Sequence, residues 1–142
     1  LSWGTEYKTP DGYVIRIDEP TLQDTYEYEN FSGDIEDRAP EDGGQWAFVN
    51  IYVKNETGST EFSPFADDFP LITGNTQYDS SILLDDPINK DQQFEGGELQ
   101  PVFERSGFIV YAIDSGLSIG DFRVAYSKQT FGGEISVNWQ TE

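Results

Sequence analysis

Residues 46–53 have the sequence WAFVNIYV, and this stretch decides the fold. Its odd-numbered positions carry small or branched apolar side chains, and three of its even-numbered positions carry aromatic rings. Because successive side chains of a strand point to opposite faces of a sheet, this alternation predicts a β-strand. A strand that is apolar on both faces is covered on both sides. The stretch therefore predicts a central strand of an all-β domain.

Weaker alternation recurs on both sides of this stretch, between turn signals such as Thr9-Pro10-Asp11-Gly12. The longest such run is 102–113, and Gly107 inside it predicts a bulge or bend. The chain shows no helical periodicity. It therefore predicts a single domain, residues 1–142, folded as an antiparallel β-sandwich of about seven to nine strands. Besides 46–53, strands are expected at 3–8, 13–18, 21–29, around 69–71, and at 76–78, 102–113, 122–127 and 134–139.

Two long acidic connections interrupt this pattern, near 30–45 and 79–98. Both lack strand alternation, and the first contains one proline and three glycines. Connections longer than about 12–15 residues are uncommon in compact domains unless they are functional or mobile. We therefore expect these two segments to be long surface loops.

The charge is strongly one-sided: 27 Asp and Glu oppose 8 Lys and Arg, giving a net charge of −19. The acids are spread along the chain, which favours adaptation to concentrated salt over the alternative of an acidic protein that docks on a basic partner. At about 1 M salt the screening length falls to roughly 3 Å, so self-repulsion is weak and solvent cations are the expected partners. No basic stripe is present, which excludes nucleic acid and disfavours anionic membranes. No run of 18 apolar residues occurs.

The residue types for most catalytic and metal sites are missing. The chain has no His and no Cys, so it lacks a Ser-His-Asp triad, a thiol nucleophile and the preferred ligands of zinc and copper. No glycine-rich nucleotide motif follows a strand. We therefore assign no catalytic residue, cofactor or metal ligand, and expect a protein that is not an enzyme.

Carboxylates leave two chemical alternatives open. A calcium site needs six to eight oxygens, and the acids that could contribute lack the spacing of a calcium loop. A hydrolase using two carboxylates is the other alternative. In a chain with 27 acids such pairs also arise by chance, and solvated surface is the favoured interpretation. The calcium candidates are Asp34, Glu36, Asp37, Asp67, Asp68, Asp85 and Asp86.

Two further features suggest surface roles. Sequons occur at Asn30 and Asn55, both in expected loops or turns where an N-glycosylation acceptor must be exposed. The aromatic face of the central strand (Trp46, Phe48 and Tyr52) could stack on sugars or a partner, but such a stripe is more often covered by another part of the fold. Core packing is the favoured interpretation.

Several segments resemble a known family: FVNIYVKNETGS at 48–59, FPLITGNTQY at 69–78, ELQP at 98–101 and SGFIVYAID at 106–114. They are similar to secreted and lipid-anchored immunoglobulin-like domains of bacteria and archaea, a family labelled only as a domain of unknown function and similar in build to mycobacterial immunoprotective extracellular proteins. The chain departs from that pattern in its 30–45 insert and at Val102-Phe103, where the family often has Gly after the corner proline. The matching positions are Val49, Ile51, Val53, Asn55, Phe69, Leu71, Gly74, Tyr78, Leu99, Pro101, Gly107, Phe108 and Val110.

The resemblance implies an exported immunoglobulin-like sandwich, often tethered to the cell envelope by a lipidated Cys that would lie upstream of Leu1. It carries no established catalytic residues. We therefore expect an extracellular or envelope-anchored, non-enzymatic module of a halophile that binds an unidentified protein, small molecule or glycan. The alternative is a carbohydrate-binding β-sandwich with a structural calcium ion.

Overall fold

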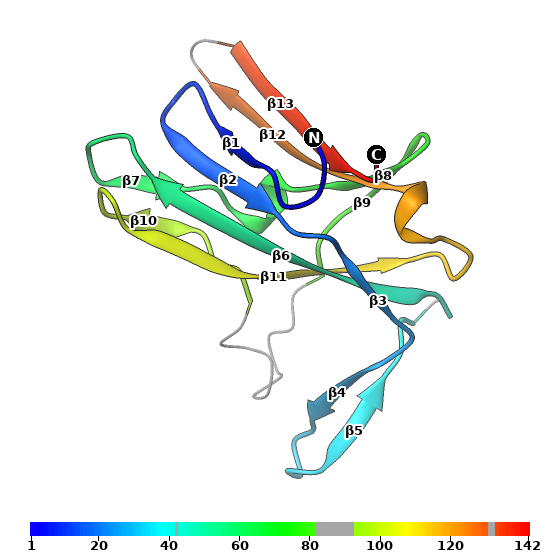
Figure 1. Cartoon of the computed structure of the whole chain (residues 1–142). Helices are drawn as coiled ribbons and strands as arrows, with labels where there is room; N and C mark the ends of the chain where they lie inside the picture. Colours follow the sequence, from blue (N-terminus) through cyan, green and yellow to red (C-terminus); the bar gives the residue numbers. More distant parts are fainter. Residues whose placement is uncertain (42, 82–92, 131–132) are drawn as a thin grey trace.

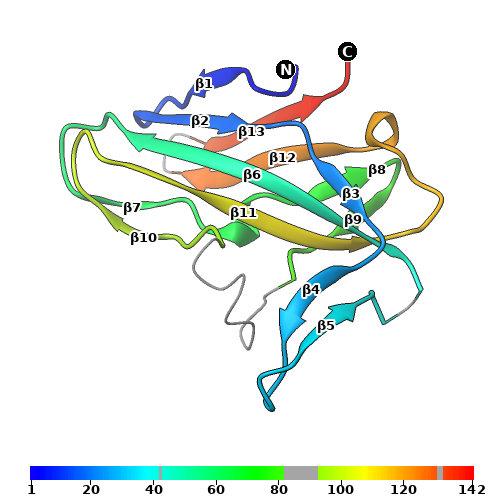
Figure 2. The same cartoon turned by 60° about the horizontal axis from the view of Figure 1, so that its bottom comes forward.

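The computed structural model describes residues 1–41, 43–81, 93–130 and 133–142 as two antiparallel sheets packed face to face (Figures 1 and 2). One sheet has five strands and the other four, so the two sheets hold nine of the thirteen strands among the described residues. Helical structure there is limited to two short 3-10 turns, η1 and η3. The predicted antiparallel β-sandwich is confirmed.

The first sheet has the order β1-β2-β6-β11, with β3 also paired to β6, and the second has the order β13-β12-β8-β9. Two further pairs, β4-β5 and β7-β10, lie outside these sheets. The bounds are β1 (Glu6–Lys8), β2 (Tyr13–Ile17), β3 (Thr21–Gln23), β4 (Tyr26–Glu29), β5 (Ile35–Arg38), β6 (Gln45–Asn55), β7 (Glu61–Ser63), η1 (Ala66–Asp68), β8 (Leu71–Thr73), β9 (Thr76–Tyr78), β10 (Gly97–Leu99), β11 (Glu104–Ile113), η3 (Ile119–Asp121), β12 (Arg123–Thr130) and β13 (Gly133–Gln140).

The central strand is β6, as its sequence predicted. It pairs with β2 and β3 along one edge and with β11 along the other. Its inward side chains Ala47, Val49, Ile51 and Val53 are at most 1% exposed. They pack against the second sheet, in the core that also holds Trp139. Fully burying an aliphatic side chain of this size stabilises the fold by about 1.5–3 kcal/mol, so this alternation anchors the sandwich.

Of the bulge or bend expected at Gly107, the structure shows no bulge. The ladder between β11 and β6 continues without interruption from Glu104 to Ile113. The glycine instead allows a close crossing, because a Cβ at this position would lie 2.6 Å from the backbone nitrogen of Phe94. Phe94 there donates a backbone hydrogen bond to the Phe108 carbonyl at 2.9 Å. This bond occupies part of the free edge of β11 and limits pairing with another chain.

The segment 30–45 is not one long loop. It contains β5, which pairs with β4 to form a hairpin that projects from the sandwich (Figure 1). The sequence of β5, IEDR, has no apolar alternation, and three of its four residues are exposed while Arg38 is half-buried. The second expected connection, 79–98, contains β10 at its end, and residues 82–92 lie outside the described part of the chain.

The corner after β10 is strained. Phe103 donates a backbone hydrogen bond to the Gln100 carbonyl at 3.1 Å, which closes a turn with Pro101 and Val102 at its centre. Val102 has φ +68°, the only positive φ of a non-glycine residue in the described ranges. This position of a type II turn normally holds Gly, and a left-handed conformation costs an L-residue about 1–2 kcal/mol.

No helix among the described residues has the length and apolar character needed to cross a membrane.

Candidate functional site

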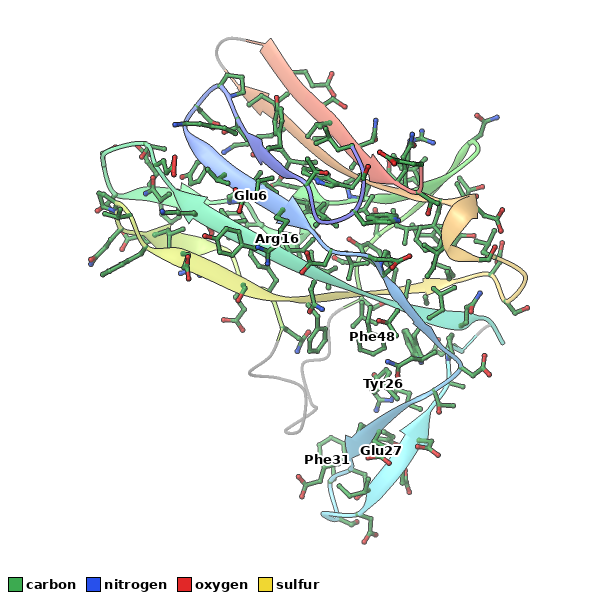
Figure 3. All side chains as sticks on the ribbon, in the orientation of Figure 1. Glu6, Arg16, Tyr26, Glu27, Phe31 and Phe48 are labelled. Carbon is green, nitrogen blue, oxygen red and sulfur yellow. The ribbon has the colours of Figure 1, made fainter. Side chains whose placement is uncertain are left out.

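The β4-β5 hairpin is anchored on the outer face of the first sheet by aromatic side chains. The Tyr26 ring lies 5.1 Å from that of Trp46 and 5.9 Å from that of Phe48, centroid to centroid. Phe48 in turn lies 5.4 Å from Phe108 on β11. Figure 3 shows Tyr26 and Phe48 between the hairpin and the sheet. Aromatic pairs at these distances add about 0.5–1.5 kcal/mol beyond their area burial, so the base of the hairpin is held firmly.

Arg38 connects the two strands of the hairpin to the sheet. Its guanidinium lies 3.9 Å from the centre of the Tyr28 ring, a cation–π contact. One of its amino groups donates to the Tyr26 hydroxyl at 3.4 Å, and its carbonyl accepts a hydrogen bond from the Trp46 indole at 2.9 Å. Arg38 therefore fixes where the hairpin leaves the sandwich.

The tip of the hairpin is built by Asn30. Its side-chain oxygen accepts hydrogen bonds from the backbone N–H groups of Ser32 and Asp34, at 2.9 and 3.0 Å. Gly33, with φ +83°, supplies the left-handed residue that this turn requires. The turn leaves Phe31 100% exposed. This fully exposed apolar ring is available for contact with another molecule.

A hollow of about 960 Å³ opens at the base of the hairpin, between it and the ends of β6 and β11. Its polar lining comes from Arg38, Glu41, Tyr78, Ser81 and Asp114, and its apolar lining includes Trp46 and Tyr26. This volume lies at the upper end of the range for ligand sites of small molecules. The site we consider is this hollow together with the hairpin.

A buried glutamine fixes the wall opposite the hairpin. The Gln45 side chain is 8% exposed, and its amide nitrogen lies within hydrogen-bond distance of the Asp114, Ser115 and Leu117 carbonyls, at 3.0, 3.3 and 2.7 Å. These bonds hold the turn after β11 in place. The close approach of Gly44, where a Cβ would lie 2.1 Å from the Ile113 carbonyl, brings the two walls together.

The electrostatics of the hollow are mixed. The Tyr78 hydroxyl donates to an Asp114 carboxylate oxygen at 2.9 Å. Burial, together with this hydrogen bond, raises the pKa of Tyr78 above its usual value. The phenol is therefore neutral at physiological pH and offers a polar group beside a carboxylate. Arg38 is the cationic member of the lining, and Glu41 and Asp114 are the anionic ones. Such a lining can form hydrogen bonds to a neutral polar or a cationic ligand.

The aromatic face predicted from the sequence is mostly covered. Trp46 is 7% exposed, and the hairpin lies over Trp46 and Phe48. Tyr52 is half-buried, with the Arg16 guanidinium 4.8 Å from its ring centre and its hydroxyl donating to Glu104 at 2.7 Å. The favoured interpretation of this stripe, packing rather than ligand stacking, is confirmed for Trp46 and Phe48.

The acidic calcium candidates do not converge in the described part of the chain, which contains no group of three or more carboxylates placed to hold a metal ion. Asp68 accepts a hydrogen bond from the Phe65 N–H at 2.9 Å. Asp67 lines a second, smaller hollow of about 390 Å³ with Phe94. Asp34, Glu36 and Asp37 are exposed on the hairpin, and Asp85 and Asp86 lie outside the described residues. No described Asp or Glu side chain is buried, so these residues do not form a buried carboxylate pair.

The two sequons differ in accessibility. Asn30 is partly exposed at the hairpin tip. The expectation that Asn55 lies in an exposed turn is wrong, because it is the last residue of β6 and is 0% exposed. Its side-chain nitrogen donates to the Ser59 and Leu99 carbonyls at 2.9 and 2.7 Å. The folded domain therefore hides this nitrogen from a glycosylating enzyme.

Sequence reasoning missed the residues that form the hollow. Arg38 and Asp114, which line the hollow, and Gln45, which supports its wall, come from three separate segments, and no local motif connects them. The available signal was the aromatic pattern of Tyr26 and Tyr28, which is typical of a strand with one apolar face. An apolar face of this kind packs against another apolar surface, and the outward-facing aromatic side chains Trp46 and Phe48 of β6 provide it.

The two stacked sheets, with their hairpin and hollow, define an immunoglobulin-like β-sandwich domain. Residues 21–135 match the family described as a domain of unknown function (DUF4352). Because the match covers more than half of the chain, the protein belongs to this family. The resemblance inferred from the sequence, to immunoglobulin-like domains of unknown function, is confirmed at this level. No curated protein sequence matches the chain.

Solved structures show the same fold. The crystal structure of the yjhA protein of Bacillus subtilis is similar with a TM-score of 0.71 and 15% identity over 99% of both chains. A candidate lipoprotein of the same organism, ycdA, has a TM-score of 0.60 and 19% identity over 99% of this chain and 39% of its own. MPT63, a secreted protein of Mycobacterium tuberculosis, has a TM-score of 0.58 and 14% identity over 99% and 95% of the two chains.

Proposed function

We propose that this protein is an exported, cell-envelope-associated binding module that has no catalytic activity and works in high salt. The observation that carries the binding role is the hollow of about 960 Å³ at the base of the β4-β5 hairpin. Its walls are fixed by Arg38 and Gln45, through hydrogen bonds to Trp46 and to the turn after β11. A preformed concave site loses little conformational entropy when a ligand binds.

The lining favours a protein segment or a small polar solute as ligand. Tyr78 and Asp114 offer a neutral phenol and a carboxylate next to each other, and Arg38 lies on the hairpin side. The hairpin covers the rings of Trp46 and Phe48, which are therefore not free to act as a flat platform for a sugar. This is why an interaction or solute-binding module is preferred over a carbohydrate-binding module with calcium.

Export is supported by two relatives in fold, one described as secreted and one as a candidate lipoprotein. High-salt adaptation is supported by the charge of −19 and by the exposure of the carboxylates: within the described ranges, no Asp or Glu side chain is buried. Such an acidic surface would repel itself in dilute buffer and be tolerated in concentrated salt.

The binding role is tested by filling the hollow without disturbing the fold. Gly116 lines the hollow, and a Cβ at this position would meet nothing within 4 Å. Gly120 is equally open but lies outside the hollow. We would screen the wild type by thermal shift in 2 M KCl against a panel of small polar solutes and cationic peptides. We expect Gly116→Trp to weaken the best binder at least tenfold and Gly120→Trp to leave it unchanged.

Equal affinity of the Gly116→Trp variant, or a panel without any binder, would reject the hollow as the ligand site. The proposed location is tested separately, by fractionating the source organism and detecting the protein with an antibody. The protein should appear in the envelope or the medium, and a purely cytoplasmic signal would contradict export.

A further inference from the structure

A second surface lies at the end of the sandwich where β10 turns into β11. Two consecutive residues of this turn, Val102 and Phe103, are 71% and 58% exposed. Phe62 on β7, the strand paired with β10, is 62% exposed. Figures 1 and 2 both place the turn after β10 beside the connection between β6 and β7. We call Phe62, Val102 and Phe103 the apolar end.

The conformation of Val102 indicates that its side chain serves a purpose outside the domain. A valine at φ +68° is strained, whereas glycine would adopt this conformation freely. Because the side chain is mostly exposed, it gains little from packing within its own domain. Strain that persists without an internal benefit is typical of binding sites.

The turn is held rigidly in this strained form by a neighbouring strand. Val102 donates a backbone hydrogen bond to the Asn55 carbonyl at 2.8 Å, and Asn55 donates one to the Phe103 carbonyl at 3.0 Å. The Asn55 side chain donates to the Leu99 carbonyl at 2.7 Å. The turn is thus bonded on both sides to the buried end of β6, and its two apolar side chains are presented in a preorganised way.

The charges around the apolar end indicate which charge a partner should carry. Glu61, Glu98 and Glu104 are exposed on the strands β7, β10 and β11 that border it. The nearby cations are already engaged. Lys8 and Lys54 both pair with Glu56, at 3.3 and 3.9 Å, and Arg105 donates to the Ser63 hydroxyl and the Glu98 carbonyl at 3.0 and 2.9 Å.

We propose that the apolar end is a docking surface for a polypeptide partner that offers an apolar pocket bordered by Lys or Arg. Carboxylates around an apolar centre complement such a rim at contact distance, whereas anionic lipid headgroups and a second copy of this chain would bring like charges into that contact. This surface is distinct from the hollow at the hairpin base, because none of its three residues lines the hollow.

The experiment uses nuclear magnetic resonance of the ¹⁵N-labelled domain in 2 M KCl, where long-range attraction is screened. The probe is a 14-residue peptide of alternating Leu and Lys, and its control is the alternating Leu and Glu peptide. We expect the Lys peptide to shift amide signals at 61–63 and 98–104. The Glu peptide should bind at least tenfold more weakly.

Substitutions separate docking from folding. Val102→Gly removes the apolar side chain, so it should lower the affinity for the Lys peptide at least fivefold. Because this substitution also relieves the backbone strain, it should raise the melting temperature of the domain. Phe103→Ser should weaken binding of this peptide similarly, and Leu1→Ser, which removes another apolar side chain that is 45% exposed, should not. Unchanged affinity of the Val102→Gly variant, shifts spread over acidic residues of the whole surface, or equal binding of both peptides would overturn the proposal. The proposal would also be overturned if neutral phosphatidylcholine vesicles, but not the Lys peptide, caused the amide signals of the domain to be lost.

Discussion

The side-chain nitrogen of Asn55 donates a 2.7 Å hydrogen bond to the carbonyl oxygen of Leu99, and this bond ties the end of β6 to the end of β10. The same nitrogen donates to the Ser59 carbonyl at 2.9 Å, and the side-chain oxygen accepts from the Thr57 N–H at 2.8 Å. A residue that belongs to a sequon therefore acts as an internal connector between a strand, a turn and a corner.

Replacing Asn55 should destabilise the domain strongly. Asn55→Ala leaves the Leu99 carbonyl without the amide that now satisfies it, and each buried polar group left unpaired costs about 1–3 kcal/mol. We expect a total loss of roughly 3 kcal/mol or more in the free energy of unfolding, measured by urea denaturation in 2 M KCl. Asn30→Ala, in an exposed turn, is the control and should cost about 1 kcal/mol or less. Similar losses for both variants would contradict the connecting role of Asn55.

Val102→Gly should stabilise the domain. Relief of the left-handed conformation gains about 1–2 kcal/mol, and the greater freedom of glycine in the unfolded chain offsets about 0.5–1 kcal/mol of this. A net gain of roughly 1 kcal/mol corresponds to a rise of about 4 °C in melting temperature for a domain of this size. Val102→Ala keeps the strain and is the matched control, for which we expect a change near zero. A loss of stability in Val102→Gly would show that the turn is not strained.

Gly107→Ala should destabilise the domain by about 1–3 kcal/mol, the usual cost of overpacking. The new Cβ would lie 2.6–2.8 Å from backbone atoms of Phe94 and Gln93, which cannot rotate away as a side chain would. Gly116→Ala is the control, because its Cβ would meet nothing within 4 Å and its φ is not positive. Thermal unfolding of the two variants gives the comparison, and equal melting temperatures would refute the close crossing.

The sandwich could be predicted because its main signal is local. In β6 each inward residue is separated by one from the next, so a short window shows which face is buried. Ile15 and Ile17 on β2 repeat the pattern, and both are 0% exposed. A strand with this pattern can bury its apolar side chains only within a sheet that packs against another layer.

The hairpin and the hollow could not be predicted in the same way. The strand β5 is mostly exposed, and it forms because the Asn30 turn aligns it with β4 and because the Arg38 carbonyl binds the Trp46 indole. Gln45 and the Asp114 carbonyl meet across 69 positions of the chain. Such contacts depend on the assembled sheets. The sequon rule failed at Asn55 for the same reason, since two of the residues that bond to Asn55, Leu99 and Phe103, are distant in sequence.

Two tyrosines should ionise well above the normal range. The hydrogen bond to Glu104, with burial, raises the pKa of Tyr52 to about 12, and burial near Glu61 raises that of Tyr13 to about 12. Both groups ionise near pH 10 when the chain is unfolded, so the stability that these two tyrosines contribute is fully present below pH 10 and is lost between pH 10 and 12. In an absorbance titration at 295 nm, the ionisation step that is present in the wild type and missing in Tyr52→Phe should have its midpoint near pH 12. A lost signal near pH 10 would contradict the bond to Glu104.

Stability should rise with salt. The described residues form four ion pairs, all between side chains at least one-third exposed, and such pairs contribute about 0–1 kcal/mol each. They engage three carboxylate side chains, so most of the negative charge is balanced only by ions from solution. We expect the melting temperature to rise by about 10 °C between 0.1 and 3 M KCl, which is roughly 2–3 kcal/mol for a domain of this size. A variant carrying Glu19→Gln, Asp24→Asn and Glu98→Gln lacks three exposed charges. Its melting temperature should be higher than that of the wild type at 0.1 M KCl, and the difference between the two proteins should be smaller at 3 M KCl. A melting temperature that is constant or falls with salt would show that repulsion between carboxylates does not limit this fold.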